Sequence, residues 1–138
     1  MPREVLAVRY GSRVTRKQES FFNYHVYGEP DAPLEVDYYF WVIRDPDGTV
    51  TLIDTGFAPE AGRRRQRRQD LTPAEALPLL GIDPADVGTV VITHAHWDHT
   101  GNLSQFPGAE IVMSQDEYAF WTSPVARRTH FALHSEQD

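Results

Sequence analysis

Four side chains able to bind a metal ion lie within one short stretch of this chain. The stretch follows an apolar run at residues 90–93 and contains His94, His96, Asp98 and His99. Imidazole nitrogen and carboxylate oxygen are ligands for borderline divalent ions such as zinc, and a hydrolytic site needs them on a stiff support with one coordination position left for water. Because residues i and i+2 of an extended segment point the same way, His94 and His96 can bind one ion from one side. Asp98 and His99 stand where the chain must turn, and they can reach a second ion beside the first.

The surroundings of these residues favour a metal site over a chance cluster. Small and turn-prone residues at 100–102 let the backbone wrap tightly behind the histidines. The alternative is that the histidines are ordinary surface or core residues that happen to be neighbours. That alternative does not explain why ligand-type residues alternate directly after a buried-strand pattern. For Trp97, inside the motif, two interpretations stay open: it walls a substrate pocket or it packs the loop.

The composition limits what such a site can be. The chain has 138 residues, about the size of one domain or a piece of one. Its 20 acidic and 13 basic residues give a formal charge of -7, which argues against a surface for nucleic acid or anionic membrane. There is no cysteine, so any metal must be held by nitrogen and oxygen. Residues 1–6 are not an apolar stretch of signal-peptide length and no segment approaches the ~20 apolar residues of a membrane span, so a cytoplasmic protein is the default expectation.

Hydrophobic patterning and turn formers predict several strands. A β-hairpin is expected from residues 36–44 and 49–53, which are rich in β-branched and aromatic residues and are joined by the turn sequence Asp-Pro-Asp-Gly. The other expected strands are residues 5–8, 89–93 and 109–113. Residues 13–20 are polar, and we expect them to be exposed.

Two helices are predicted from their capping residues. Thr72 and Glu75 form a capping box at the start of residues 73–80, with a proline at the first helical position, a bend expected at Pro78 and a stop at the following glycine. Ser114 and Glu117 repeat this capping logic, which predicts a helix up to about residue 121.

Several side chains outside the histidine motif allow more than one interpretation. Asp54 ends a strand, where it is either a cap or turn residue or a partner that holds a metal-bound histidine by its far nitrogen. The basic run at residues 63–68 could contact phosphates but is more typical of a solvated helix face or loop. The aromatic residues of segment 21–27 either pack, or some of them line an acyl or aryl pocket. His130 and His134 could share a helix face as ligands, but we expect an ordinary tail because nothing near them supplies a strand end or a turn.

Two motifs in sequence order resemble the metallo-β-lactamase superfamily. They are the His-x-His-x-Asp-His motif at residues 94–99, after its apolar strand, and the upstream Leu-Ile-Asp-Thr-Gly at residues 52–56. Within that superfamily, residues 37–44, 54–57 and 101–107 look most like the N-acyl homoserine lactonase branch. The resemblance extends from about residue 4 to residue 121.

The resemblance implies a fold class and a metal centre. The fold is α/β (α+β), an αββα sandwich that carries two metal ions, usually zinc, at one edge. By resemblance, His94 and His96 hold the first ion, and Asp98 and His99 hold the second.

The family also takes a third histidine, a bridging carboxylate and a further histidine from the C-terminal half of its fold. His130 and His134 follow His99 too closely to match them. We therefore expect residues 1–138 to form a single, incomplete domain, the N-terminal half of the sandwich.

The implied activity is metal-dependent hydrolysis of an acyl lactone, as in quorum quenching. Two cations would lower the pKa of a shared water to give hydroxide, and Asp98 would be the catalytic residue that passes a proton to the leaving oxygen. The alternatives are a thioesterase, a β-lactamase-like hydrolase, or a truncated product without catalysis. A negatively charged chain suits a neutral acyl lactone better than a phosphodiester.

A half-domain would also leave one apolar sheet face uncovered. We expect this face to be built by Tyr39, Trp41, Val50 and Leu52 or by their alternates in the strands. A homodimer is one assembly that would bury it.

Overall fold

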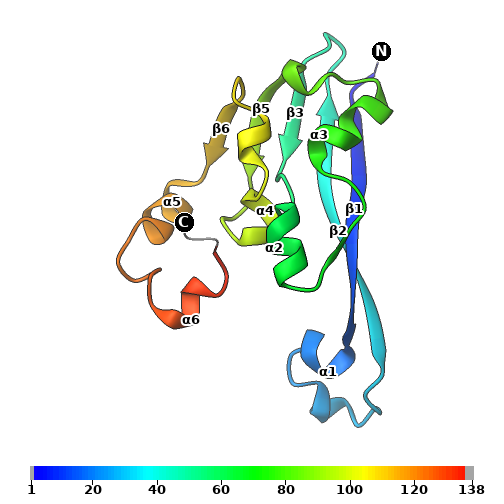
Figure 1. Cartoon of the computed structure of the whole chain (residues 1–138), viewed down its shortest axis with the longest axis vertical. Coiled ribbons are helices and arrows are strands. Elements are labelled where there is room, and N and C mark those ends of the chain that lie inside the picture. The colour runs from blue at the N-terminus through cyan, green and yellow to red at the C-terminus, as the bar shows by residue number, and fades with distance from the viewer. Residues whose placement is uncertain (1, 136–138) are drawn as a thin grey trace.

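The computed structural model describes residues 2–135, which form one six-stranded mixed sheet with the strand order β4-β1-β2-β3-β5-β6 (Figure 1). The strands are β1 (Glu4–Arg16), β2 (Pro33–Arg44), β3 (Val50–Ile53), β4 (Arg68–Gln69), β5 (Val87–Ile92) and β6 (Glu110–Met113). Antiparallel pairing joins β4, β1, β2 and β3, and parallel pairing joins β3, β5 and β6. The predicted mixed α/β class is confirmed.

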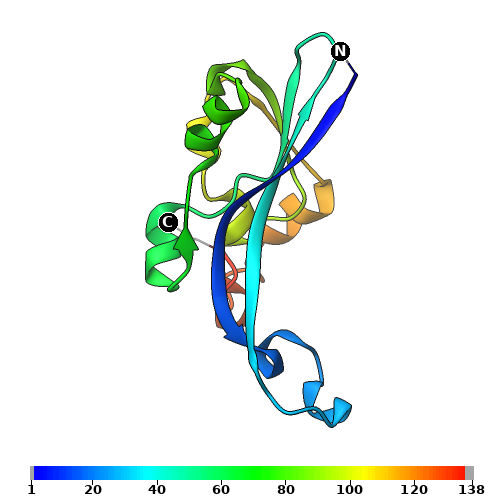
Figure 2. The same ribbon diagram turned by 90° about the vertical axis from the view of Figure 1, so that its right-hand side faces the viewer.

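Short helices connect these strands. The α-helices are α1 (Lys17–Ser20), α2 (Pro59–Arg64), α3 (Pro73–Ala76), α4 (Trp97–Thr100), α5 (Gln115–Trp121) and α6 (Thr129–Ala132). The 3₁₀ turns are η1 (Tyr24–Tyr27), η2 (Leu77–Leu80), η3 (Pro84–Asp86) and η4 (Leu103–Gln105). Both α2 and α3 lie on one side of the β1–β2 hairpin (Figure 2). None of the helices in the described range has the length and hydrophobicity that a membrane span requires.

The β1 and β2 strands pair as a hairpin that the sequence did not predict, and both are longer than the strands expected at residues 5–8 and 36–44. Residues 13–16 continue β1, because Arg13 pairs with Val36 and Arg16 with Pro33 across the hairpin. The expected exposure of this stretch is confirmed for Val14, Arg16 and residues 18–20. An ion pair between Arg16 and Asp31 closes its far end. The tip, with α1 and η1, therefore projects beyond the rest of the molecule (Figure 2).

The two predictions from turn and cap residues are confirmed in their main features. The β2–β3 turn is closed by the Gly48 amide, which donates to the Asp45 carbonyl at 2.9 Å. Thr72 and Glu75 form the capping box of α3. The helix then changes to the 3₁₀ turn η2 around Pro78, which lacks the amide hydrogen that an α-helix needs at that point.

The hydrophobic core lies between the sheet and the helical layer. Its largest fully buried side chains are Tyr10, Phe40, Phe57, Leu52, Leu77, Val42 and Val90. Phe57 follows β3 and packs edge-on against Tyr10 and Tyr38, with ring centroids at 5.0 and 5.2 Å. This packing anchors the segment after β3 next to the histidine loop.

Helices cover one face of the sheet in the described part of the chain. Val42 and Leu52 pair across β2 and β3 and are fully buried in the core. Tyr39 and Trp41 point to the opposite face, where each is 44% exposed. The expected apolar face was therefore wrong in part, because it mixed residues of both faces: Val50 and Leu52 belong to the core, whereas Tyr39 and Trp41 remain exposed.

Candidate functional site

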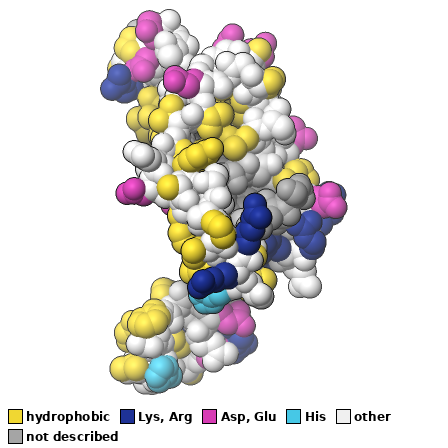
Figure 3. Space-filling view, turned by 90° about the vertical axis from the view of Figure 1, so that its left-hand side faces the viewer, with side chains coloured by type: hydrophobic (Ala, Val, Ile, Leu, Met, Phe, Trp, Pro, Cys, Tyr) yellow, Lys and Arg dark blue, Asp and Glu magenta, His cyan; other side chains and the backbone are white. Residues whose placement is uncertain are grey.

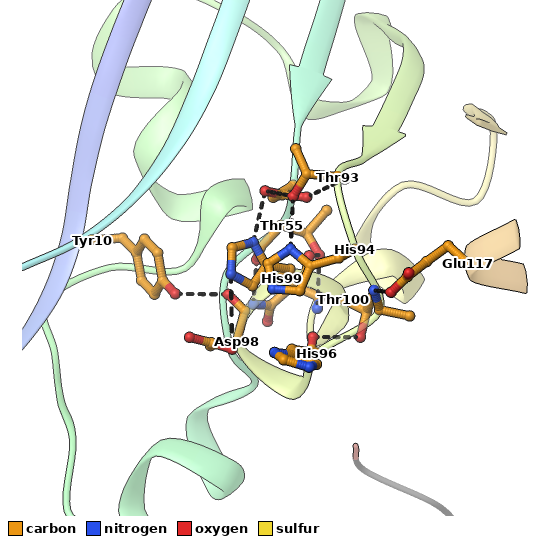
Figure 4. Close-up of polar contacts among 12 residues, drawn as sticks. Tyr10, Thr55, Thr93, His94, His96, Asp98, His99, Thr100 and Glu117 are labelled. Carbon is orange, nitrogen blue, oxygen red and sulfur yellow. Dashed lines mark hydrogen bonds and ion pairs between the residues drawn. The ribbon is translucent and has the colours of Figure 1, made fainter. Parts of the chain in front are cut away.

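The predicted metal-binding residues lie on a loop directly after β5. This strand ends at Ile92, and His94 and His96 follow in the connection to α4, for which His96 is the N-cap. Asp98 and His99 are in the first turn of α4, where the His99 amide donates to the His96 carbonyl at 3.0 Å. The chain therefore folds back on itself within six residues and turns the ligand-type side chains toward one another (Figure 4).

The structure brings all four predicted side chains together. The His94 ring centroid lies 3.9 Å from that of His99 and 4.5 Å from that of His96. Nε2 of His99 is 3.9 Å from Oδ1 of Asp98. Within residues 2–135, no three histidine or carboxylate side chains are spaced closely enough to hold an ion as they stand. The arrangement gathers the donors, and metal binding by them stays a prediction.

Asp54 is the carboxylate that orients the site. It follows β3 with a left-handed backbone (φ 62°) and is only 5% exposed. Its Oδ2 lies 2.7 Å from Nδ1 of His99 and accepts from the Thr93 hydroxyl at 2.8 Å, while its Oδ1 accepts from the Thr93 amide at 2.8 Å. Of the two interpretations of Asp54, the structure favours the histidine partner. A proton on Nδ1 of His99 leaves Nε2 unprotonated, with its lone pair free to bind a metal ion on the Asp98 side.

The charges of this pair are mutually stabilised. Burial by itself would raise the pKa of Asp54, but hydrogen bonds from His99 and Thr93 outweigh it and hold that pKa below its usual value. Burial by itself would lower the pKa of His99, but the hydrogen bond to Asp54 and the charge of that carboxylate raise it above its usual value.

Two loops are fastened to each other behind the histidines. The Thr55 amide donates to the His99 carbonyl at 2.7 Å, and the Asn102 side-chain amide donates to the carbonyls of Thr55 and Phe57 at 2.8 Å each. Gly101 makes this close approach feasible, since a Cβ there would lie 2.2 Å from the Ala58 nitrogen. The residues read as turn formers in the sequence therefore fasten the histidine loop to the segment that carries Asp54.

Trp97 packs the loop, which was one of its two interpretations. Its side chain is 8% exposed and stacks on Phe57 with ring centroids 5.3 Å apart. The Arg65 guanidinium lies over the Trp97 ring, with its central carbon 4.5 Å from the ring centroid. The basic run at residues 63–68 begins in the last turn of α2 (Pro59–Arg64) and continues into the following loop, and its Arg65 contacts the histidine loop.

Sequence reasoning missed Glu117. Its role was read as the return half of a capping box, and Ser114 does accept from the Glu117 amide at 3.2 Å. The Glu117 carboxylate reaches the histidine loop instead, where it accepts from the Ala95 amide at 2.7 Å and from Trp121 Nε1 at 2.7 Å. Burial would raise the pKa of Glu117, but these hydrogen bonds and the nearby histidines lower it. The local sequence holds no signal for this contact, which depends on how α5 packs.

Tyr10 was also missed, and His134 was interpreted as part of an ordinary tail. The expectation of an unrelated tail is wrong for His134, whose ring stacks on that of His96 at 5.1 Å and whose carbonyl accepts from the Trp97 amide at 2.9 Å. Burial, aided by neighbouring histidines, lowers the pKa of His96. The Tyr10 hydroxyl donates to the Asp98 carbonyl at 3.1 Å from β1. The His130 ring contacts that of Phe131, its neighbour in sequence.

A family model of the metallo-β-lactamase superfamily matches residues 35–117, more than half of the chain. The chain belongs to this superfamily. It is 34% identical over 106 residues to the N-acyl homoserine lactonase AttM of Azorhizobium caulinodans, a match that covers 67% of this chain and 40% of the relative. The chain thus spans about 40% of the length of the curated lactonases it matches.

Solved structures agree on the fold. A probable metal-dependent hydrolase from Staphylococcus aureus superposes with a TM-score of 0.68 at 18% identity, over 93% of this chain and 52% of that chain. AidC, a dizinc quorum-quenching lactonase in complex with a product, superposes with a TM-score of 0.65 at 18% identity, over 96% of this chain and 52% of that chain. The expectation of a metallo-β-lactamase-like fold is confirmed.

Proposed function

We propose that this chain is the N-terminal part of a metal-dependent hydrolase that opens the ring of an N-acyl homoserine lactone or a closely related lactone. The observation that carries the proposal is the contact between Asp54 and Nδ1 of His99 at 2.7 Å, beside His94, His96 and Asp98. A buried carboxylate on the far nitrogen of a histidine is the usual support of a metal-binding imidazole. Kinship with lactonases such as AttM supports the substrate class.

The donor set fits a borderline divalent cation. It consists of imidazole nitrogen and carboxylate oxygen without thiolate, as zinc centres of hydrolytic enzymes require. We assign His94 and His96 to one zinc ion and Asp98 and His99 to a second. Metal ions bound there would supply Lewis acidity to the lactone carbonyl and lower the pKa of an attacking water. The remaining ligands would come from outside the 138 residues.

The residues of this chain contribute orientation and proton transfer. Asp54 fixes the tautomer and the ring plane of His99, and Glu117 fixes the backbone between His94 and His96 through the Ala95 amide. Opening a lactone releases an alkoxide, which must take up a proton. Asp98, next to the reacting bond, is the group we assign to deliver that proton.

The test is turnover by the purified whole protein that carries this chain. N-hexanoyl homoserine lactone, an acyl thioester and a β-lactam would be offered in parallel, with and without chelator and added zinc. We expect zinc-dependent opening of the lactone, and Asp98→Asn should reduce kcat by about 100-fold or more, because general-acid assistance contributes roughly 10²–10⁴. Zinc-dependent turnover of only the thioester or the β-lactam would replace the lactonase assignment, and no turnover of any substrate would favour a product without catalysis.

A further inference from the structure

A cavity of about 590 Å³ opens beside the histidine loop and is walled by arginines. The side chains that matter here are Arg13, Arg65, Arg67, Tyr38, His96 and Asp98, and we call the space they line the arginine pocket. Arg13 comes from β1, and the other two arginines come from the segment between α2 and β4. In the view from the β6 side, several basic side chains lie over the lower half of the main body (Figure 3).

The chain's fold holds these arginines in place. Arg13 pairs with Val36 across the hairpin, so it faces the same side of the hairpin as Tyr38. Nη1 of Arg67 donates to the Arg65 carbonyl at 2.6 Å, and Nη2 of Arg65 donates to the Leu133 carbonyl at 2.9 Å. Backbone carbonyls therefore hold the guanidinium groups of Arg65 and Arg67 in the pocket wall, unlike solvated side chains on a helix face.

Two of these guanidinium groups lack a partner for a buried nitrogen. The Nε atoms of Arg13 and Arg67 are shielded from solvent and have no hydrogen-bond partner among the described residues. Elsewhere in the described chain, exposed arginines such as Arg9 and Arg68 are paired with carboxylates. A shielded guanidinium nitrogen without a partner is costly, so proteins normally satisfy it.

The positive charge considered in the pocket is that of Arg13 and Arg67. Asp98 is the one carboxylate among the described residues that line it, and the proposed function assigns that group to the metal centre. The chain as a whole has a formal charge of -7, so these cations in the pocket contrast with the charge of the rest of the molecule.

We propose that the arginine pocket binds an oxyanion, a carboxylate or a phosphate, carried by the acyl part of the substrate. This deepens the proposed function, on which it rests, because it makes the substrate an anionic acyl lactone in place of a neutral one. Guanidinium groups match the planar, bidentate geometry of such anions. The pocket shares His96 and Asp98 with the metal centre, so an anion bound by Arg13 and Arg67 places the acyl chain next to the reacting carbonyl.

The first experiment measures substrate preference. N-adipoyl and N-hexanoyl homoserine lactone differ by a terminal carboxylate, so the ratio of their kcat/KM values reports on anion recognition alone. We expect the whole protein to favour the adipoyl compound by about tenfold or more, the value of one charged hydrogen bond. Arg13→Gln and Arg67→Gln should bring the ratio close to one, while Arg67→Lys should keep part of it. Arg63→Gln is the matched control, because Arg63 belongs to the same basic run and is exposed outside the pocket.

The second experiment is independent of turnover. Calorimetric titration of adipate and of inorganic phosphate into the whole protein should show binding that Arg13→Gln and Arg67→Gln abolish and Arg63→Gln preserves, with melting temperatures confirming that each variant folds. The tighter of the two probes identifies the anion. If no lactone is opened but an anion binds through these arginines, the lactonase proposal fails and the anion site stands. If lactones are opened with equal preference in all variants and neither anion binds, the arginine pocket proposal is overturned.

Discussion

Asp54 joins two parts of the chain that are 45 residues apart in sequence. Its carboxylate accepts from the Thr93 backbone and hydroxyl and from the His99 ring, so one side chain fixes both the start of the histidine loop and the plane of its last imidazole. This requires the left-handed backbone of Asp54, a conformation that aspartate adopts more readily than most residues.

Asp54→Asn should weaken metal binding more than it weakens the fold. The amide keeps the shape of the carboxylate but loses its charge and presents a donor to Nδ1 of His99, which already carries the proton. Loss of such a support typically costs 10–100-fold in metal affinity. The measurement is competition for zinc with a chromophoric chelator.

Asp83→Asn is the matched control for this substitution. Asp83 accepts from the Ala85 amide at 2.9 Å in the cap of η3. Its replacement by asparagine makes the same chemical change far from the histidines. Equal zinc affinity of Asp54→Asn and Asp83→Asn would show that Asp54 has only a structural role.

At the scale of single residues, spacing along the chain was enough to find the histidine motif but not the side chains that hydrogen-bond to its backbone. His94, His96, Asp98 and His99 are neighbours in sequence, so strand and turn geometry predicts that they converge. Tyr10 reaches Asp98 from 88 residues away and Glu117 reaches Ala95 from 22 residues away. Such contacts depend on tertiary packing, which a periodic pattern cannot encode.

At the scale of elements, α5 supports the loop between β5 and α4. Glu117→Ala would remove the acceptor of the Ala95 amide and of Trp121 Nε1, leaving both donors without their partner. We expect a loss of about 1–3 kcal/mol in the free energy of unfolding, the typical cost of removing a charged acceptor. We also expect weaker zinc binding, because the backbone between His94 and His96 loses its anchor.

Denaturant unfolding and zinc competition measure these two effects. Asp116→Ala, at the neighbouring exposed position in the first turn of α5, is the control. If Asp116→Ala and Glu117→Ala had the same effect on both quantities, α5 would act only through its helix stability.

The close contact between α4 and the segment after β3 depends on one glycine. Gly101→Ala would place a methyl group 2.2 Å from the Ala58 nitrogen and 2.7 Å from the Phe57 carbonyl carbon. These atoms are backbone and cannot rotate away, so we expect destabilisation of about 1–3 kcal/mol or more. In Gly88→Ala the new methyl group would have its nearest neighbour at 4.0 Å, so this variant serves as the control in the same thermal unfolding experiment.

The elements themselves were largely predictable because their signals are local. The β2–β3 hairpin, the capped helix before Gly81 and the strands before and after the histidine loop all appear where alternation, caps and turn residues place them. The extension of β1 to Arg16 was not predictable from local signals, because its polar residues are stabilised by pairing with β2 and by cross-strand ion pairs such as that of Arg9 with Asp37. Cross-strand partners determine whether such a segment forms a strand, and these partners lie elsewhere in the sequence.

At the scale of the whole molecule, the sheet separates two different surfaces. One face packs on the helices and forms the core, and it includes Val42 and Leu52. The other face carries Tyr39 and Trp41, which are each 44% exposed, together with Val5 and Val112. Register places these side chains on one side of the sheet. Trp41 pairs with Ala7, two residues from Val5, and with Ile53, which is in register with Val91 and Val112 on the next two strands. An apolar sheet face of this kind promotes association.

We therefore predict that the 138-residue chain, expressed alone, associates with itself and binds a hydrophobic dye. Size-exclusion chromatography with light scattering gives the mass, and anilinonaphthalene sulfonate fluorescence reports the exposed face. The double variant Tyr39→Thr/Trp41→Thr should reduce both signals, because threonine retains strand preference while removing aromatic surface.

Leu79→Thr is the matched control, since Leu79 is 74% exposed in η2 and lies away from the sheet face. If the sheet face causes association, Leu79→Thr should behave like the unaltered chain. A monomeric chain without dye binding would contradict the prediction. An equal reduction in both variants would assign the association to scattered exposed side chains, because only a contiguous face makes the response depend on which apolar residue is removed.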